Sequence, residues 1–307
     1  MPVSESLTIR KKRKRKKRRA IRRIIYMAGL MAVIVIALRT ASNRLLSQNV
    51  TEQEKSIHHL QAASSTSVKP PVERHSSQIA NDLKALSSSS RFAAQIYEHR
   101  NEYPETLLSA YLNNPEMEEF TAGYLEAQAS NFTTNEIAEL TSEELAQNFP
   151  LLLQWDKRWG YQPYGGSIIG LSGCGPTCLS MVLISLTGQN NMTPAQVAQF
   201  SETNGYYVEG SGTAWSLMTE GASQLGLSAR ELSLDEYVMK AALDAGQPII
   251  CSMGAGDFTT QGHFIMIYGY NEDGFLINDP NCIARSCQSW DFDTLRGQIK
   301  NLWAYAH

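Results

Sequence analysis

The stretch SGCGPT at residues 172–177, followed by the apolar run LSMVLISL at 179–186, decides how this chain folds. It predicts a tight glycine turn that delivers Cys174 to the start of a buried helix, with Pro176 in the first turn, where no backbone donor is needed. A thiol at a helix N-terminus meets the positive end of the helix dipole, which favours the thiolate. Taken alone, this stretch fits either a nucleophilic cysteine or a buried structural one.

Histidine is scarce, and its scarcity bears on that choice. A nucleophilic cysteine needs a base, and only two of the six histidines, His263 and His307, follow Cys174. His307 is the last residue and is expected to fray. His263 begins a predicted apolar strand, where a lone imidazole needs a partner. We therefore predict that Cys174 and His263 form a nucleophile–base pair, rather than being two separate core residues.

A third group, which orients the imidazole, is expected on the next strand. Asp279 ends the segment FLIND that follows the turn at 271–274, so an antiparallel hairpin returns it toward His263. Simple pairing, however, sets Asp279 opposite Met266, and strand alternation sets Asn278 on the face of His263. Asp279 reaches the imidazole only if a bulge or bend shifts the register. Asn278 is the alternative orienting residue.

The elements around these residues predict an α+β domain. Helices are expected at 193–203, 213–225 and 234–244, and strands at 248–253, 262–268, 275–279 and 302–305. Helices that come first in the chain and antiparallel strands that come second are typical of the α+β class.

Four motifs together carry a resemblance to a known family. They are QWD at 154–156 followed by RW at 158–159, SGCGP at 172–176, GHF at 262–264 and NDP at 278–280. In order and residue type they resemble the bacteriocin-processing (double-glycine leader) peptidase-like family of papain-like cysteine peptidases, and most closely its stand-alone, membrane-anchored bacterial members. The resemblance covers about residues 148–307. It implies a papain-like fold, in which N-terminal helices pack on an antiparallel sheet.

The resemblance also implies roles for four residues. Cys174 would be the nucleophile, His263 the base, Asp279 the orienting group and Gln154 a donor to the oxyanion hole. The implied enzyme is a cysteine peptidase (a thiol protease, and so a hydrolase) that cleaves a peptide or protein substrate through an acyl-enzyme, without a cofactor or a metal. Two alternatives stay open: a cell-wall amidase or transpeptidase with the same triad, and a catalytically silent surface binding module.

The charge of the chain is distributed unevenly. Residues 10–23 hold 12 of the 27 Lys and Arg, whereas residues 40–307 hold 14 against 29 Asp and Glu. This asymmetry argues against a general nucleic-acid binder. The basic block is followed directly by fifteen uncharged residues, 24–38, which Arg39 closes. That pattern is typical of a signal or a signal anchor. We expect a retained single-pass anchor in the cell membrane, with a cytoplasmic N-terminus and an extracytoplasmic peptidase domain.

The remaining boundaries follow from composition. We expect a basic cytoplasmic tail at 1–23, a transmembrane signal anchor at 24–39, a flexible linker at 40–90, a helical spacer at 91–147 and the papain-like peptidase domain at 148–307. The linker is rich in Ser, Gln, Asn and Thr without a sustained apolar period, apart from a weak helix at 79–86. Apolar residues at helical spacing from Phe92 onward predict a spacer, or a cap packed on the next domain, without catalytic residues.

Three other cysteines and several aromatic residues have smaller expected roles. Cys178, one helical turn after Cys174, is expected to be a small core residue, and Cys282 and Cys287 could pair in an oxidising compartment. Core packing, rather than lining of a cleft, is expected for most of Trp155, Trp159, Tyr161 and Trp215.

Overall fold

The glycine-flanked cysteine begins a buried helix, as the sequence predicts. In the computed structural model, which describes residues 69–131 and 139–307, α8 runs over Cys174–Thr187. It ends at Gly188, whose φ of 69° lies in the left-handed region that glycine enters at little cost. Residues 175–184 are all buried. α8 is therefore a central helix of the domain rather than a surface helix with one apolar face.

Other helices precede and follow α8 along the chain. Those before it are α2 (Ser76–Leu86), α3 (Arg91–Glu98), α4 (Glu105–Asn113), α5 (Glu118–Ala129), α6 (Ser142–Ala146) and α7 (Ile169–Ser172), with the helical turns η1 (Arg100–Glu102) and η2 (Pro115–Met117). Those after it are α9 (Pro194–Thr203), η3 (Leu217–Gly221), α10 (Ala222–Gln224), α11 (Glu236–Asp244), α12 (Ile283–Ser286) and α13 (Phe292–Arg296). Side-chain caps start several of them; Asp235, for example, accepts from the Val238 N–H at 3.0 Å.

A six-stranded antiparallel sheet has the strand order β5-β10-β6-β7-β8-β9. Its strands are β5 (Ser228–Glu231), β6 (Ile249–Met253), β7 (His263–Asn271), β8 (Gly274–Asn278), β9 (Ser289–Trp290) and β10 (Ile299–Ala306). Two short ribbons pair β1 (Pro163–Tyr164) with β2 (Ser167–Ile168) and β3 (Tyr207–Val208) with β4 (Gly212–Thr213). Because β10 lies between β5 and β6, the C-terminal segment is paired on both sides.

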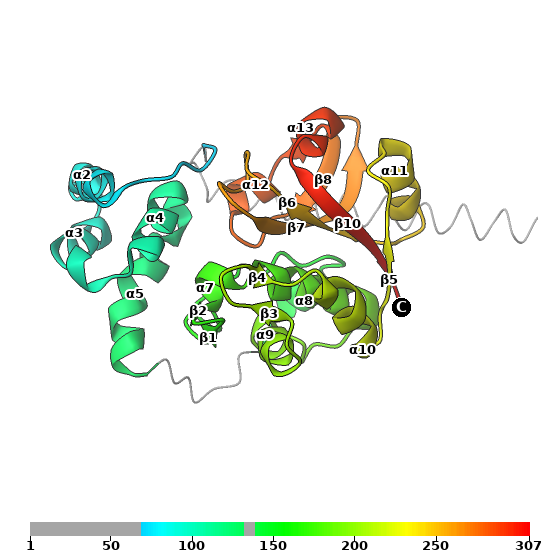
Figure 1. Ribbon diagram of the computed structural model, residues 1–307, viewed down its shortest axis with the longest axis horizontal. Helices are drawn as coiled ribbons and strands as arrows, with labels where there is room; N and C mark the ends of the chain where they lie inside the picture. The colour runs from blue at the N-terminus through cyan, green and yellow to red at the C-terminus, as the bar shows by residue number, and fades with distance from the viewer. Residues whose placement is uncertain (1–68, 132–138) are drawn as a thin grey trace, which may run out of the picture. The chain divides into compact units, whose positions relative to one another are not determined.

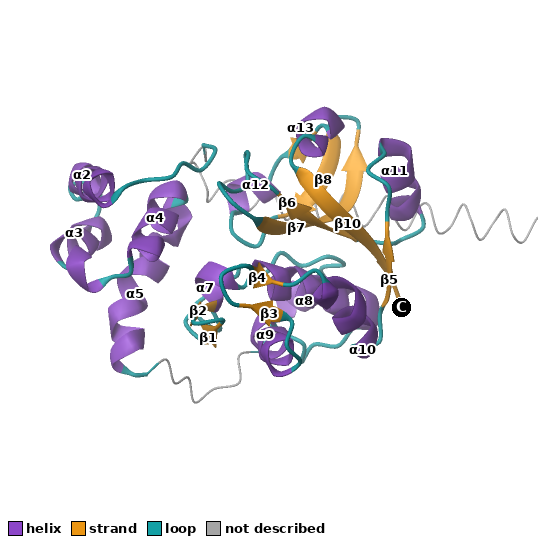
Figure 2. Cartoon of the chain, in the orientation of Figure 1, coloured by secondary structure: helices purple, strands orange, loops and turns teal. Residues whose placement is uncertain are grey.

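Different helices cover the two faces of the sheet. Cys251 of β6 and Ile265 of β7 pack with Met239 and Leu243 of α11 in one apolar cluster. α8 also contacts β7, and Figure 1 shows it on the other side of the sheet from α11 and α13. Figure 2 shows the same layers as purple helices against orange strands. This is the predicted α+β class, and the arrangement is consistent with a papain-like fold.

Helices α2 to α5 share a second apolar cluster. It includes Ile79 and Leu83 of α2 and Phe120 of α5, and it extends to Tyr161 and Ile168 beyond them in the chain. The rings of Phe120 and Tyr161 stack with centroids 4.4 Å apart, and the Tyr161 hydroxyl donates to the Phe120 carbonyl at 2.7 Å. Through these contacts the helices pack on the following domain as a cap. One of them, α2, lies inside the stretch expected to be linker.

The expectation of a membrane-anchored fold and a single-pass membrane location needs correction. Among residues 69–131 and 139–307, no helix is long and apolar enough to cross a membrane. The tail at 1–23 and the anchor at 24–39 lie outside the described residues, as does most of the linker.

The elements predicted within the domain are largely confirmed. The strands at 248–253, 262–268, 275–279 and 302–305 are β6, β7, β8 and β10, and the helices at 193–203 and 234–244 are α9 and α11. The predicted helix at 213–225 is present but shorter, because β4 ends at Thr213 and the helical stretch is the π-helical turn η3 followed directly by α10.

Candidate active site

Cys174 is the first residue of α8 and is partly exposed. The backbone on either side of it is crowded. A Cβ added at Gly173 would lie 2.5 Å from Cγ2 of Ile169, and one at Gly175 would lie 2.8 Å from Cγ2 of Thr213. Glycine is therefore needed at both positions. The crowding fixes the thiol at the start of the helix, where backbone N–H groups lack partners within the helix.

A bulge in β7 sets the position of Asp279. The pairs between β7 and β8 are Gly269–Leu276, Ile267–Ile277 and Met266–Asn278. Tyr268 is thus an extra residue on β7. The pairs beyond it, from Ile267 toward His263, are shifted by one position relative to the pairs next to the turn. Because a shift of one residue exchanges the two faces of a strand, Asp279 rather than Asn278 comes to the side on which His263 lies. The register shift that Asp279 needs to reach the imidazole is present.

His263 and Asp279 are in direct contact. His263 Nε2 lies 2.7 Å from Asp279 Oδ1, and the two side chains are 8% and 0% exposed. An ionised carboxylate can only accept, so Nε2 carries the proton and Nδ1 is the ring atom left to face a second partner. Cys174 also lies close enough to His263 to raise the pKa of its ring. The three residues that the sequence singles out therefore lie together.

Asn278, the alternative orienting residue, is engaged elsewhere. Its Nδ2 donates to the carbonyl oxygens of Phe149 and Pro150 at 3.1 and 3.2 Å. These bonds attach the end of β8 to the segment that leads to Gln154. Asn278 thus supports the site from the opposite face of the strand.

Electrostatic interactions keep both members of the His263–Asp279 pair charged. Burial would raise the pKa of Asp279, but the neighbouring Arg285 and His263 outweigh it and lower this pKa to about 2. Burial would likewise lower the pKa of His263, but the charge and hydrogen bond of Asp279, together with Cys174, raise it to about 9. At neutral pH the site therefore holds a carboxylate and an imidazolium.

Arg285 is a residue of this site that the sequence analysis missed. Its Nε donates to Asp279 Oδ2 at 2.6 Å, and its side chain is 4% exposed. The backbone around Asp279 is also bound, since Asp279 N donates to Ser286 Oγ and Asn281 N donates to Asp279 Oδ1, each at 2.8 Å. A signal was present, because Arg285 is the only Lys or Arg within residues 241–295. The same stretch holds seven Asp and Glu, so a single cation six residues after Asp279 indicates an ion-pair partner for that aspartate.

Gln154 is 4% exposed and is attached to both sides of the site. Its backbone N–H donates to the Pro280 carbonyl at 2.7 Å, directly after Asp279. Its Nε2 donates to the Gly170 carbonyl at 3.0 Å, four residues before Cys174. Within the described part of the chain, its buried Oε1 has no hydrogen-bond partner. The amide is thus held between the helix of Cys174 and the loop of Asp279, and the Gly170 carbonyl accepts from only one of its two N–H donors.

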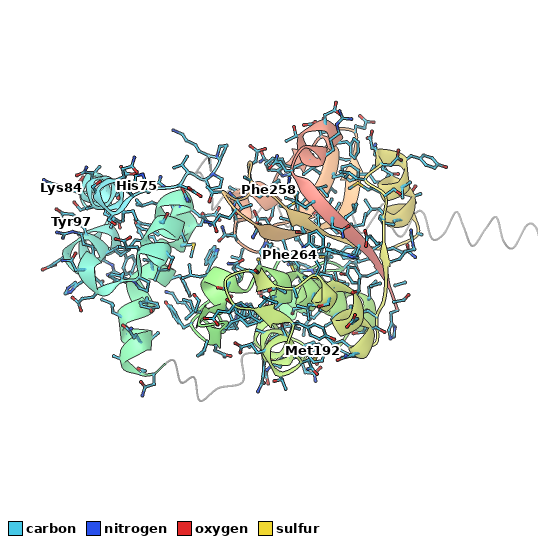
Figure 3. The ribbon with its side chains drawn as sticks, in the orientation of Figure 1. His75, Lys84, Tyr97, Met192, Phe258 and Phe264 are labelled. Carbon is cyan, nitrogen blue, oxygen red and sulfur yellow. The ribbon has the colours of Figure 1, made fainter. Side chains whose placement is uncertain are left out.

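Most of the aromatic residues belong to the core, as expected, but one does not. Trp159 and Tyr161 are 0% and 9% exposed, whereas Trp215 is 48% exposed. The Trp215 indole donates to Ser252 Oγ at 3.1 Å. Ser252 pairs with Phe264, the residue after His263, and Figure 3 marks Phe264 between the sheet and the helical layer. Trp215 is therefore the exposed one of these side chains, whereas Trp155 is half-buried against the apolar cluster of helices α2 to α5.

None of the five cysteines, all of which lie in the described part of the chain, forms a disulfide. Cys282 and Cys287 are therefore not joined to each other, and the Cys282 sulfur accepts from the Arg285 N–H at 3.4 Å. Burial raises the pKa of Cys178, Cys251 and Cys282, and raises that of Cys287 to about 11. Among residues 69–131 and 139–307, no group of three or more His, Cys, Asp or Glu is placed to hold a metal ion.

Comparison with known families agrees with this chemistry. The model of the Peptidase_C39 like family matches residues 146–307, which is more than half of the chain. The chain therefore belongs to this family, whose members are C39-type papain-like cysteine peptidases. No curated protein matches it. The matched region begins at the end of α6, so helices α2 to α5 lie outside it.

Proposed function

We propose that this protein hydrolyses peptide bonds with a Cys174–His263–Asp279 triad. The observation that carries the proposal is the buried 2.7 Å contact between His263 and Asp279, with Cys174 close enough to help raise the pKa of the His263 ring. An imidazolium beside a thiol favours the thiolate, which is the nucleophilic form. The bound, buried position of Asp279 fixes the ring so that Nδ1 is left for the sulfur.

In the proposed reaction, the Cys174 thiolate attacks the carbonyl carbon of the scissile amide and forms a C–S bond. The carbonyl oxygen takes up the negative charge, and the tetrahedral intermediate collapses as the C–N bond breaks. His263 gives its Nδ1 proton to the leaving amine. The neutral ring then takes a proton from water, whose oxygen attacks the thioester. Cleavage of the C–S bond releases the acid and restores the thiolate and imidazolium pair.

Gln154 is the proposed side-chain donor to the oxyanion. Its Nε2 has two N–H groups, and the Gly170 carbonyl accepts one of them. The other N–H, together with the backbone N–H of Cys174 at the start of α8, would stabilise the oxygen of the intermediate. Loss of one such donor commonly costs about 100-fold or more in rate.

The test compares Cys174→Ala with wild type and with Cys178→Ala, a matched control one helical turn away. Each protein is incubated with a tryptic peptide library in H₂¹⁸O, and new peptide termini are identified by mass spectrometry. We expect ¹⁸O-labelled new C-termini with the wild type and with Cys178→Ala, and none with Cys174→Ala. Iodoacetamide labelling at pH 7, mapped peptide by peptide, should modify Cys174 faster than the partly exposed Cys287.

The outcomes separate the alternatives. New termini that persist in folded Cys174→Ala would refute the mechanism. Ligated peptides without ¹⁸O would indicate a transpeptidase, because an amine rather than water accepts the acyl group. A Cys174 thiol that reacts no faster than Cys287, in the absence of cleavage, would indicate a silent binding module.

A further inference from the structure

Helices α2 to α5 and the turns between them, together called the helical region, lie outside the family match. They nevertheless contact the loop that follows Asp279 directly. Glu116, in the turn η2, accepts from the N–H of Ile283 at 2.7 Å and from the N–H of Ala284 at 2.9 Å, one with each carboxylate oxygen. These donors are the first two N–H groups of α12 (Ile283–Ser286), which have no partner within that helix. The carboxylate of Glu116 therefore fixes where α12 begins.

The short helix α12 in turn determines the surroundings of Asp279. Arg285 donates to Asp279 Oδ2 at 2.6 Å, and Ser286 Oγ accepts from the Asp279 N–H at 2.8 Å. Both residues belong to the helical turn that Glu116 caps. A continuous set of hydrogen bonds and ion pairs thus runs from Glu116 through α12 to Asp279, and from Asp279 to His263.

A second contact holds the other end of the same loop. Asn114 is 1% exposed, and its Nδ2 donates to the Asn281 carbonyl. The Trp155 indole donates to that same carbonyl at 2.8 Å. Asn281 lies between Asp279 and α12, and its own N–H donates to Asp279 Oδ1. Asn114 and Glu116 of the helical region therefore hold the loop that follows Asp279 at two points.

Other contacts between the helical region and the domain do not involve this loop. The stacking of Phe120 on Tyr161 is apolar. The ion pair of Glu119 with Lys157, at 3.2 Å, joins side chains that are 68% and 53% exposed. A pair so exposed contributes little. Glu116 and Glu119 thus offer two carboxylates, three residues apart, of which only Glu116 contacts the loop of Asp279.

We propose that Glu116 is a positioning residue for the triad. By capping α12 it holds Arg285 against Asp279, and so keeps Asp279 facing the His263 ring. The helical region is then part of the catalytic unit rather than a spacer. This inference rests on the proposed function, because it assigns Glu116 a role in that same site.

The test uses the full chain and two matched series: Glu116→Ala and Glu116→Gln, with Glu119→Ala and Glu119→Gln as controls. The first readout is the rate of Cys174 alkylation by iodoacetamide at pH 7. The second is the low-field proton resonance of His263 Nε2–H, which needs no catalysis. Misplacing a reacting group by about 1 Å can cost about 100-fold, and we expect Glu116→Ala to slow alkylation by about tenfold or more. In this variant the His263 Nε2 proton should exchange with water, so that its resonance broadens beyond detection.

The glutamine variant should fall between wild type and alanine, because its one carbonyl oxygen replaces one of two acceptors. Both Glu119 variants should match the wild type. A folded Glu116→Ala protein that keeps the alkylation rate and the proton resonance would overturn the inference. If Glu116→Ala does not fold, Glu116→Gln decides in the same way. If wild-type Cys174 reacts no faster than Cys287, the proposed function fails, and the proton resonance alone decides whether Glu116 positions Asp279.

Discussion

Two histidine–carboxylate pairs in this molecule have almost the same separation and different surroundings. In the helical region, His99 Nδ1 lies 2.8 Å from Glu102 Oε1, and the side chains are 45% and 62% exposed. At the end of the sheet, His263 Nε2 lies 2.7 Å from Asp279 Oδ1, and the side chains are 8% and 0% exposed. The hydrogen bond of Glu102 raises the pKa of His99. The pKa of His263 rises to about 9 although burial acts against it.

The difference shows that the surroundings of a histidine–carboxylate pair, not the distance between its atoms, decide how strongly the pair contributes to stability. Water can replace Glu102 as a partner of His99, and salt screens their attraction. Asp279 cannot be replaced in that way, because Arg285, the Asn281 N–H and the His263 ring all depend on its two oxygens. Removing one member of a buried set leaves the others charged and unpaired.

The largest effect is expected from removing the buried carboxylate. Asp279→Ala leaves Arg285 without its ion-pair partner and His263 without its orienting group. We expect the free energy of unfolding to fall by about 3–5 kcal/mol, and Cys174 alkylation at pH 7 to slow by about tenfold or more. Urea unfolding and peptide-mapped iodoacetamide labelling measure the two effects.

Asp279→Asn is the matched control for this change, because it keeps the shape of the side chain but has one acceptor oxygen where the carboxylate has two. It should lie between the wild type and the alanine variant in both measurements. A loss of less than about 1 kcal/mol in Asp279→Ala would mean that this pair is no more coupled than an exposed one.

A smaller effect is expected from pH. The pKa of His263 in the folded protein, about 9, lies above its ordinary value of 6.5. Its contribution to stability is therefore fully present below pH 6.5 and is lost as the pH rises through 9, with a total on the order of 3 kcal/mol. The contribution of Asp279 has the opposite sign: it is present above pH 3.8 and is lost as the pH falls through about 2.

Urea unfolding between pH 5 and pH 10 measures the contribution of His263. The wild type should lose stability steadily above pH 6.5, and Asp279→Ala should lose much less over the same range, because its imidazole has no carboxylate partner. Parallel profiles for the two proteins would contradict the assignment of the slope to this pair.

The sequence predicts the buried site better than it predicts what holds the site in place. Cys174 and His263 follow from motif and scarcity, and α8, β6, β7 and β8 follow from their apolar patterns. The need for a bulge also follows from counting residues, and Gly269, an isolated glycine inside the strand directly after Tyr268, is the signal that could have given its place. β5, β9, α12 and α13 have only two to five residues each, too few for a period to be read.

The contacts of Glu116 show a second limit of prediction from sequence. Glu116 and Ile283 are 167 residues apart, and nothing local to either residue indicates the other. The capping motif that predicts a helix start depends on a side chain within the same few residues. At α12 the carboxylate of Glu116, which lies far away in the sequence, helps to cap the first turn. Such a contact becomes evident only once the tertiary structure is known.

The smallest effect is expected at the exposed pair. Glu102→Ala removes the partner of His99 and should leave the melting temperature and the rate of Cys174 alkylation unchanged, because solvent replaces the lost hydrogen bond. Differential scanning calorimetry and the labelling assay used for Asp279→Ala give a direct comparison. A slower alkylation of Cys174 in Glu102→Ala would mean that the exposed pair acts on the site through the helical region. In that case burial could no longer explain the contrast between the two pairs.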